Sequence, residues 1–179
     1  NPLINSKGEK QYKLVNFDME EYRDLSITVE VFKRALSLPE FHDLKAGIAL
    51  QAYLPDSFEV LKDIIEFGKK RISEGKSPVR VRVVKGANMD MESFESGERN
   101  WNFTPFSKKH LTDANYKRML TYALQPENIK AVNIGIASHN LFDIAFCSLF
   151  AKEQGDLTLC TFEMLSGMST SVSRFFSKD

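Results

Sequence analysis

The stretch VRVRVVKGAN (79–88) decides the fold class of this chain. Its first six residues alternate valine with arginine and end in two valines, a period of two that predicts a β-strand at 79–84. The breaker-rich segment SEGKSP (73–78) marks where this strand begins. Arg80 and Arg82 fall on the same face of the strand. An arginine that points into a barrel needs an anion or a polar ring of partners there, whereas one on a sheet edge is simply solvated.

The flanking sequence repeats a unit of one strand and one helix. Apolar runs predict further strands at 13–18, 47–53, 131–138 and 157–162. Helical spacing predicts helices at 19–37, after Pro55 and Asp56, at 112–125 with Thr112 or Asp113 as the cap, and at 139–155 closed by Gly155. Strands that alternate with helices are typical of a parallel sheet. The segment 86–111 fits neither pattern, and we expect a long loop that is functional or mobile.

Polar residues of catalytic type stand at or next to the end of each predicted strand: Asp18, Gln51, Arg82, Lys85, Ser138, His139, Asn140 and Glu163. Every strand of a (β/α)8 barrel ends at the site, whereas in a doubly wound sheet only the strands at the switch point do, so the pattern favours the barrel. A complete barrel needs about 250 residues. We therefore predict an α/β fold, a partial (β/α)8 TIM-like barrel of about five parallel strands forming one domain over 1–179. A five-stranded open sheet is the alternative.

Several of these residues have a structural explanation as well as a functional one. Asp18 is equally suited to cap a helix that starts at Met19. The amide of Gln51 lies inside an apolar strand and needs polar partners, which either the protein or a ligand can supply. His139 is explained as well by a core histidine as by a ligand contact. Trp101, the only tryptophan, either contacts a ligand as part of a lid or has no such role.

The composition excludes several classes of protein. The chain has 24 Lys+Arg against 24 Asp+Glu, so its formal net charge of zero offers no basic face for nucleic acid and no polybasic membrane anchor. No apolar run approaches the roughly 18 residues of a spanning helix. We interpret Cys147 and Cys160 as buried free thiols of a cytoplasmic protein. The three histidines are unrelated in spacing, and we expect no metal site.

Six blocks of the sequence carry a family resemblance: FDMEEYRDLSITVEVFKRAL (17–36), GIALQAYLPDSF (47–58), VRVVKGANMD (81–90), TDANYKRM (112–119), IGIASHNLFDIA (134–145) and FEMLSGM (162–168). In this order they resemble the proline dehydrogenase family, above all the dehydrogenase domain of the bifunctional proline utilisation A proteins. The resemblance spans roughly residues 13–170. Its most specific parts are the R-V-V-K-G-A and A-S-H-N blocks.

The resemblance implies FAD at the carboxyl ends of the strands and a role for each matched residue. The implied catalytic residues are Arg82, beside flavin N5, and Asp18, at the substrate end of the pocket. The implied cofactor contacts are Gln51 at the pyrimidine side, Lys85, Gly86, Ala87 and Lys109 at the pyrophosphate and adenine side, and His139 near the ribityl chain or phosphate. Leu165 would pack on the proline ring. Asn88 stands where many members have tyrosine, so we expect different packing around the substrate.

The implied reaction is oxidation of L-proline to Δ1-pyrroline-5-carboxylate, the step that leads from proline to glutamate. Electrons would leave to a quinone, and the parent protein would be cytoplasmic, at the periphery of the inner membrane, with an aldehyde dehydrogenase domain in the same chain. The family's first-strand lysine and last-helix arginine pair are not found, so the chain corresponds to strands two to six. We expect these 179 residues alone to be inactive and to self-associate through open sheet edges.

Two other functions stay open at this point. The first is a non-catalytic barrel fragment, with or without affinity for flavin, or a module that binds flavin or phosphate. The second is an unrelated, doubly wound α/β enzyme whose phosphate-bearing ligand sits at KGAN (85–88). In that case Asp18 and His139 would lie too far apart to share one site.

Overall fold

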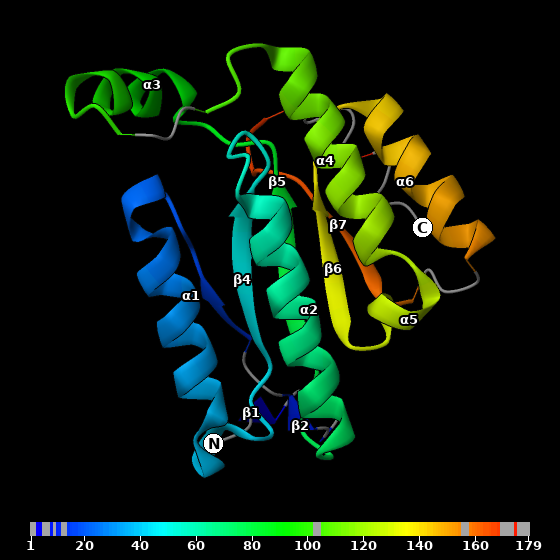
Figure 1. The fold of residues 1–179 in the computed structure, drawn as a ribbon. Helices are drawn as coiled ribbons and strands as arrows, with labels where there is room; N and C mark the ends of the chain where they lie inside the picture. The colour runs from blue at the N-terminus through cyan, green and yellow to red at the C-terminus, as the bar shows by residue number, and fades with distance from the viewer. Residues whose placement is uncertain are drawn as a thin grey trace.

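A five-stranded parallel sheet forms the centre of the molecule (Figure 1). The computed structural model describes residues 3–4, 8, 10–11, 14–101, 105–154, 158–168 and 174. The strands are β3 (Val15–Phe17), β4 (Ala46–Gln51), β5 (Val79–Val84), β6 (Val132–Ala137) and β7 (Cys160–Glu163). They lie side by side in the order of the sequence, and each pairs in parallel with the next.

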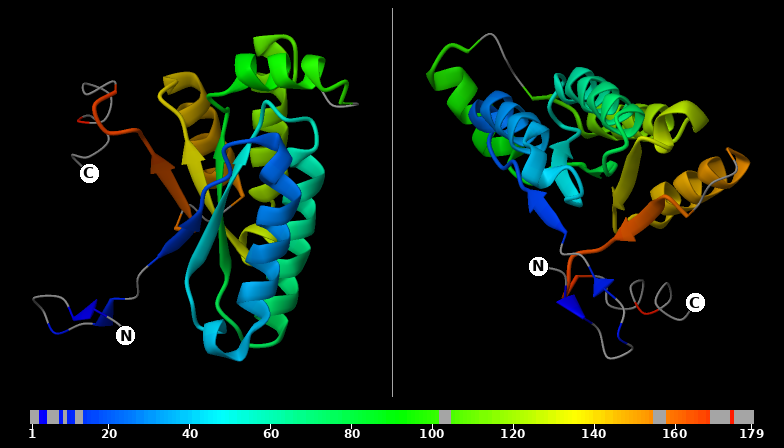
Figure 2. Two further views of the ribbon diagram at one scale, coloured as in Figure 1. Left: turned by 90° about the vertical axis from the view of Figure 1, so that its left-hand side faces the viewer. Right: turned by 90° about the horizontal axis from the view of Figure 1, so that it is seen from below.

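The strand order confirms the partial barrel. A doubly wound sheet reverses its strand order at a switch point, and the order β3-β4-β5-β6-β7 contains no reversal. The connecting helices α1 (Tyr22–Ser37), α2 (Ser57–Ser73), α4 (Lys109–Ala123) and α6 (Leu141–Glu153) lie on one side of the sheet, as the two views of Figure 2 show. Helices on the outside and strands in sequential order are the arrangement of a (β/α)8 barrel.

The helix-covered face of the sheet carries the hydrophobic core. The strand residues that point to the helices are fully buried valines, isoleucines and leucines: Ile48, Leu50, Val79, Val81, Val83, Val132, Ile134 and Ile136. Helix α1 contributes one apolar stripe to this core, because it buries Leu25, Val29, Phe32 and Leu36. Burying such side chains contributes roughly 1.5–3 kcal/mol each, so this face supplies most of the stability.

The opposite face of the sheet has small and polar residues instead. Arg80 and Arg82 of β5 lie between Gly47 and Ala49 of β4 on one side and Asn133 and Gly135 of β6 on the other. Because parallel partners in register share a face, the glycines and Ala49 leave room beside the two arginines. No helix of the described residues covers this face (Figure 2).

The structure corrects three sequence predictions in the helices. The first helix begins at Tyr22 with Glu21 as its N-cap, so Asp18 lies too far upstream to be the cap of this helix. The segment 86–111 is not one loop, because it contains helix α3 (Met89–Glu98). Helix α4 starts at Lys109 with Lys108 as N-cap, rather than at Thr112 or Asp113.

The remaining differences are local. Gly155 and Leu157 lie outside the described residues, as does Lys13, and the last strand is found at Cys160–Glu163. Short elements that the sequence did not predict are the antiparallel pair β1 (Leu3–Ile4) and β2 (Lys10–Gln11), the 3-10 turn Pro39–Phe41 and α5 (Pro126–Ile129). Neither cysteine forms a disulfide bond within the described part of the chain, but Cys160 is only half-buried. Burial raises the pKa of the Cys147 thiol to about 12. No helix among the described residues is both long enough and apolar enough to cross a membrane.

Candidate active site

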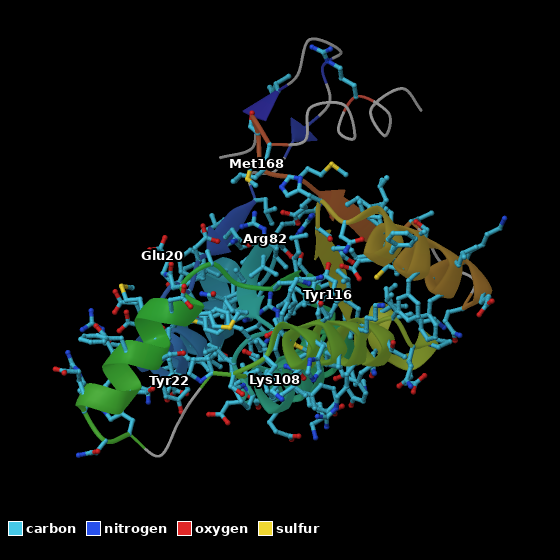
Figure 3. All side chains as sticks on the ribbon, turned by 90° about the horizontal axis from the view of Figure 1, so that it is seen from above. Glu20, Tyr22, Arg82, Lys108, Tyr116 and Met168 are labelled. Carbon is cyan, nitrogen blue, oxygen red and sulfur yellow. The ribbon has the colours of Figure 1, made fainter. Side chains whose placement is uncertain are left out.

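A cavity of about 770 Å³ lies at the carboxyl ends of the strands. Its lining combines every site residue singled out from the sequence, namely Asp18, Gln51, Arg82, Lys85, Gly86, Ala87, Asn88, Lys109, His139 and Leu165, with residues such as Met19, Glu20 and Met168 that were not. Asp18 and His139 therefore share one site, contrary to the expectation for an unrelated doubly wound enzyme. In Figure 3, which looks onto these strand ends, Arg82 lies away from the helix-covered side where Tyr116 is found.

Arg82 is held between two carboxylates. Its Nε donates to Oε2 of Glu163 over 2.6 Å, and its Nη1 donates to Oδ1 of Asp18 over 3.0 Å. Asp18 also accepts a bond from the amide of Asn16 at 2.6 Å. This position explains Asp18 better than helix capping does. Glu163, which the sequence marked only as a strand end and the site assignment left out, contacts Arg82 directly.

Gln51 is largely buried, and its amide is bonded to the chain. Its Nε2 donates to the carbonyl oxygens of Met19 and Glu20 over 2.6 and 3.1 Å. Asn88 donates to the same Glu20 carbonyl over 3.3 Å. Together these bonds fix the segment between β3 and α1 as one wall of the cavity. The protein therefore satisfies the donor side of the Gln51 amide itself.

The turn after β5 requires glycine at position 86. Gly86 has a φ of +116°, and a Cβ there would lie 1.7 Å from Cδ1 of Tyr53. The backbone consequently runs directly over the Tyr53 ring, and no larger residue fits. Gly86 and Ala87 are both exposed in the cavity lining, so a ligand can approach the main chain closely here.

Lys85 belongs to a cluster of alternating charges. Its Nζ pairs with Oδ1 of Asp113 and, at 2.7 Å, with Oδ2 of Asp143, while Asp113 also pairs with Lys109 at 2.6 Å. Burial lowers the pKa of Lys85, but the two carboxylates outweigh it and the net shift is upward. Asp113 shows the reverse balance: burial raises its pKa, the two lysines lower it, and the net shift is downward. Two carboxylates thus keep Lys85 charged beside the cavity.

The segment after β6 forms the other wall. The backbone N–H of Leu165 donates to Nε2 of His139 over 3.2 Å, and Nδ1 of His139 is buried without a hydrogen-bond partner among the described residues. Asn140 caps α6, because its Oδ1 accepts from the N–H of Phe142 at 2.9 Å. His139 is therefore neither a fully satisfied core histidine nor remote from the cavity. Its free nitrogen is a polar group that a ligand can satisfy.

Trp101 does not line the cavity. Its ring packs on Tyr22 with centroids 6.4 Å apart, and the guanidinium of Arg99 lies over it at 5.2 Å. Within the described ranges, no group of three His, Cys, Asp or Glu side chains could hold a metal ion. The chemistry that the site offers is a charged guanidinium, a lysine and exposed main-chain atoms, which together suit a ligand that carries or develops negative charge.

Comparisons with known proteins agree with this geometry. A family model described as proline dehydrogenase matches residues 2–179. Proline utilization A from Corynebacterium freiburgense superposes with a TM-score of 0.86 at 43% identity over 89% of this chain. The protein of the same name from Bdellovibrio bacteriovorus, inactivated by N-propargylglycine, gives 0.84 at 39% identity over 92%. The Bradyrhizobium japonicum protein gives 0.79 at 26% identity over 92%.

The chain spans only a small part of these relatives, 16%, 17% and 16% of their lengths in the same order. Among curated proteins no relative matches it significantly. The family model nevertheless matches almost from end to end, and the solved structures agree in both fold and sequence. The chain belongs to the proline dehydrogenase family.

Proposed function

We propose that this chain provides the flavin- and substrate-binding face of an enzyme that oxidises L-proline to Δ1-pyrroline-5-carboxylate. The observation that carries the proposal is the position of Arg82. Its guanidinium lies in the cavity at the carboxyl ends of the strands, in a chain of the proline dehydrogenase family. A fixed cation there favours negative charge on a group that accepts a hydride.

The cavity is suited to FAD in size and in the groups it offers. Its volume of about 770 Å³ exceeds what a single amino acid needs and lies in the range of cofactor sites. The free Nδ1 of His139 and the exposed main chain of Gly86 and Ala87 are unfilled polar positions in its walls. When bound, FAD supplies the acceptor for the hydride that leaves proline.

The residues of the chain divide the remaining work. Lys85, Gly86, Ala87 and Lys109 would hold the phosphate and adenine side, Gln51 the pyrimidine edge and His139 the ribityl or phosphate region. Asp18 and Arg82 would orient the reacting groups, and Asn88 and Leu165 would shape the substrate end. Leu165 is 66% exposed here and offers an apolar surface to a small ring. Its N–H donates to Nε2 of His139, so this bond joins the segments that follow β7 and β6.

The first experiment is a visible absorption spectrum of the protein after incubation with FAD and gel filtration. We expect this chain to retain the flavin bands, and in the parent protein, which would supply the rest of the barrel, we expect L-proline to bleach them without oxygen. Arg82→Met should keep the bands but slow the bleaching about 10²–10³-fold, because it removes a preorganised cation. Arg34→Met, on the exposed face of α1, is the matched control and should bleach at the normal rate.

A second function from another class is a flavin-binding module without chemistry. Its sign is a protein that keeps its flavin bands but is not bleached by L-proline. A protein that stays colourless would contradict both functions. We expect the isolated 179-residue chain to bind flavin more readily than it turns over proline, since the residues implied to clamp the proline carboxylate were not found in the sequence.

The partners implied by the family complete the proposal. We propose residues 1–179 as one domain of a cytoplasmic protein that also carries an aldehyde dehydrogenase domain, passes electrons to a quinone at the inner membrane and leads proline towards glutamate. The edge strands β3 and β7 each have one strand partner among the described residues. Helix α6, which precedes the edge strand β7, also carries exposed apolar side chains, namely Leu141, Phe142 and Leu149. These surfaces support pairing with a further strand or a second copy.

A further inference from the structure

The carboxylate of Glu163 joins two arginines across the inner face of the sheet. Its Oε1 accepts from Nη2 of Arg80 over 2.7 Å, and its Oε2 accepts from Nε of Arg82 over 2.6 Å. Nη2 of Arg80 also donates to the hydroxyl of Thr161. The side chains of Glu163, Arg80 and Arg82 are 23%, 22% and 32% exposed, so these ion pairs are partly removed from water.

The contact depends on a glycine in the strand between the two partners. Arg82 lies on β5 and Glu163 on β7, and β6 separates these strands. Gly135 of β6 is in register with Arg82 on one side and with Thr161 on the other. A Cβ at Gly135 would lie 2.1 Å from Oε1 of Glu163 and 3.3 Å from Cα of Arg82. Because Gly135 has no side chain, the space above it is open, and the carboxylate of Glu163 crosses β6 through this space to reach Arg82 on β5.

The bond to Nε determines which way the guanidinium faces. Nε of Arg82 is occupied by Glu163 and Nη1 by Asp18. The bonds of Arg82 to the described residues use Nε and Nη1 only, so Nη2 is the nitrogen left for a ligand. A planar guanidinium with two of its three nitrogens bonded on different sides cannot rotate without breaking one of the bonds. Charge is balanced as well, because two carboxylates face two arginines.

We propose that Glu163 is a positioning residue, which reaches across Gly135 and fixes the Arg82 guanidinium for the reaction. The inference rests on the proposed function for the role of Arg82, but the positioning itself is a property of the protein without cofactor. A structural role alone, as a tie between β5 and β7, would change stability and leave the reaction unchanged once the protein is folded.

The first test needs no flavin. In the cofactor-free protein, the Nε–H signal of Arg82 in an 15N-correlated NMR spectrum should be visible and slow to exchange, with Arg82→Lys giving its assignment. Glu163→Ala should remove this signal, whereas Thr161→Val, which loses a contact only to Arg80, should retain it. An Arg82 signal that is absent from the unmodified protein, or that persists in Glu163→Ala, would overturn the positioning.

The second test measures the reaction in the FAD-loaded parent protein. Glu163→Ala should lower the rate constant of flavin reduction by L-proline about 10–100-fold, the loss expected from misplacing a group by about 1 Å, with KM changed less than about threefold. In an Arg82→Met background the same substitution should have almost no further effect, since a residue that acts through Arg82 has nothing left to position. Fully additive losses would contradict the proposal.

Two more variants separate reach from charge. Glu163→Gln keeps the length of the side chain and an acceptor oxygen but loses the charge, whereas Glu163→Asp keeps the charge and is one methylene shorter. Positioning by contact predicts that the glutamine variant recovers more of the rate and of the Arg82 signal. Recovery by aspartate alone would point to charge and overturn the proposal. Gly135→Ala, which fills the space above Gly135, should reproduce Glu163→Ala.

The two tests keep the proposals apart. If the NMR result holds but the protein neither binds FAD nor oxidises proline, the proposed function fails and the positioning of Arg82 stands. If flavin reduction proceeds normally in Glu163→Ala, the proposed function stands and the role of Glu163 in it fails.

Discussion

The two faces of the sheet are built from alternate residues of the same strands, yet they differ in almost every physical respect. On β5 the valines at 79, 81 and 83 are buried against the helices, while Arg80 and Arg82 remain half-buried on the open face. On β6, Ile134 is inaccessible to solvent and its neighbours Asn133 and Gly135 turn the other way. The apolar side chains of one face pack against the helices, and the charged side chains of the other face lie at the edge of a cavity.

This difference teaches that stability and chemistry are assigned to opposite sides of one strand. Removal from water stabilises the apolar face, whereas a charge removed from water must find a partner. The open face meets that condition with pairs such as Arg82–Glu163 rather than with packing. Substitutions on the helix-covered face should therefore affect unfolding, and substitutions on the open face should affect binding and rate.

The largest effect should come from breaking the covered face. Ile134→Ala removes a fully buried side chain from the centre of the core and should lower the free energy of unfolding by about 3 kcal/mol. Asn133→Ala, one residue earlier on the open face, should change it by about 0.5 kcal/mol or less. Urea unfolding of both variants measures the contrast. Equal losses would mean that the open face is as much a part of the core as the covered one.

The two faces also use arginine differently. Arg71 of α2 is 2% exposed and donates to the carbonyl oxygens of Leu36, Phe41, His42 and Ser77. Arg71→Met should cost about 2–3 kcal/mol, because it removes several buried or part-buried hydrogen bonds that a charged donor makes. Arg82→Met should cost less than about 1 kcal/mol. Glu163 still has its ion pair with Arg80, and Asp18 is exposed, so water can solvate its carboxylate. Thermal unfolding of the two variants compares them, and a larger shift for Arg82→Met would contradict the division.

Much of the covered face could be predicted from the sequence. The alternation in VRVRVV gave the bounds of β5 without error, and the helical spacing of Leu25, Val29, Phe32 and Leu36 identified the buried stripe of α1. Both patterns follow directly from burial on one side of an element. Helix α3 was missed because its apolar residues form no stripe: Phe94 is 68% exposed, and the buried positions are Glu92 and Ser96.

The open face could be predicted only as a set of residues. Strand ends indicated which side chains meet, and the structure brings them to one cavity. The sequence could not predict which of these side chains form ion pairs with each other. The bond between Glu163 and Arg82 depends on a glycine in a third strand, and the register of three strands is a tertiary property. The predicted start of α4 was also wrong, because Asp113 forms ion pairs with Lys85 and Lys109 and does not cap the helix.

Two glycines in helices allow the same comparison with smaller changes in stability: Gly68 packs against the sheet and Gly97 is exposed. A Cβ at Gly68 of α2 would lie 2.8 Å from the carbonyl oxygen of Ala131 and 2.9 Å from Cγ2 of Val132. Gly68→Ala should therefore push the helix from the sheet and cost about 1–2 kcal/mol. At Gly97 of α3 no described residue lies within 4 Å of such an atom, so Gly97→Ala should stabilise by about 0.5 kcal/mol through helix propensity. Denaturant midpoints of both variants give the sign, and a shared sign would refute the argument.

The smallest effect concerns the rim where α3 meets α1. Glu92 is 2% exposed and accepts the N–H of Tyr22 at 2.6 Å, so it satisfies the first N–H of α1, whose N-cap residue Glu21 makes no side-chain capping bond among the described residues. Burial raises the pKa of Glu92 above its ordinary 4.5. The folded protein consequently holds this proton to higher pH than the unfolded chain, and stability should fall as pH rises through the interval above 4.5.

Two variants test this pH dependence. Glu92→Gln keeps an acceptor for the Tyr22 N–H and should remove the part of the slope that is due to Glu92. Glu95→Gln changes a half-buried residue on the same helix and should leave most of the slope. Urea midpoints from about pH 4 to about pH 7 measure it, and a slope unchanged in Glu92→Gln would show that Glu92 does not link α3 to α1 through its charge.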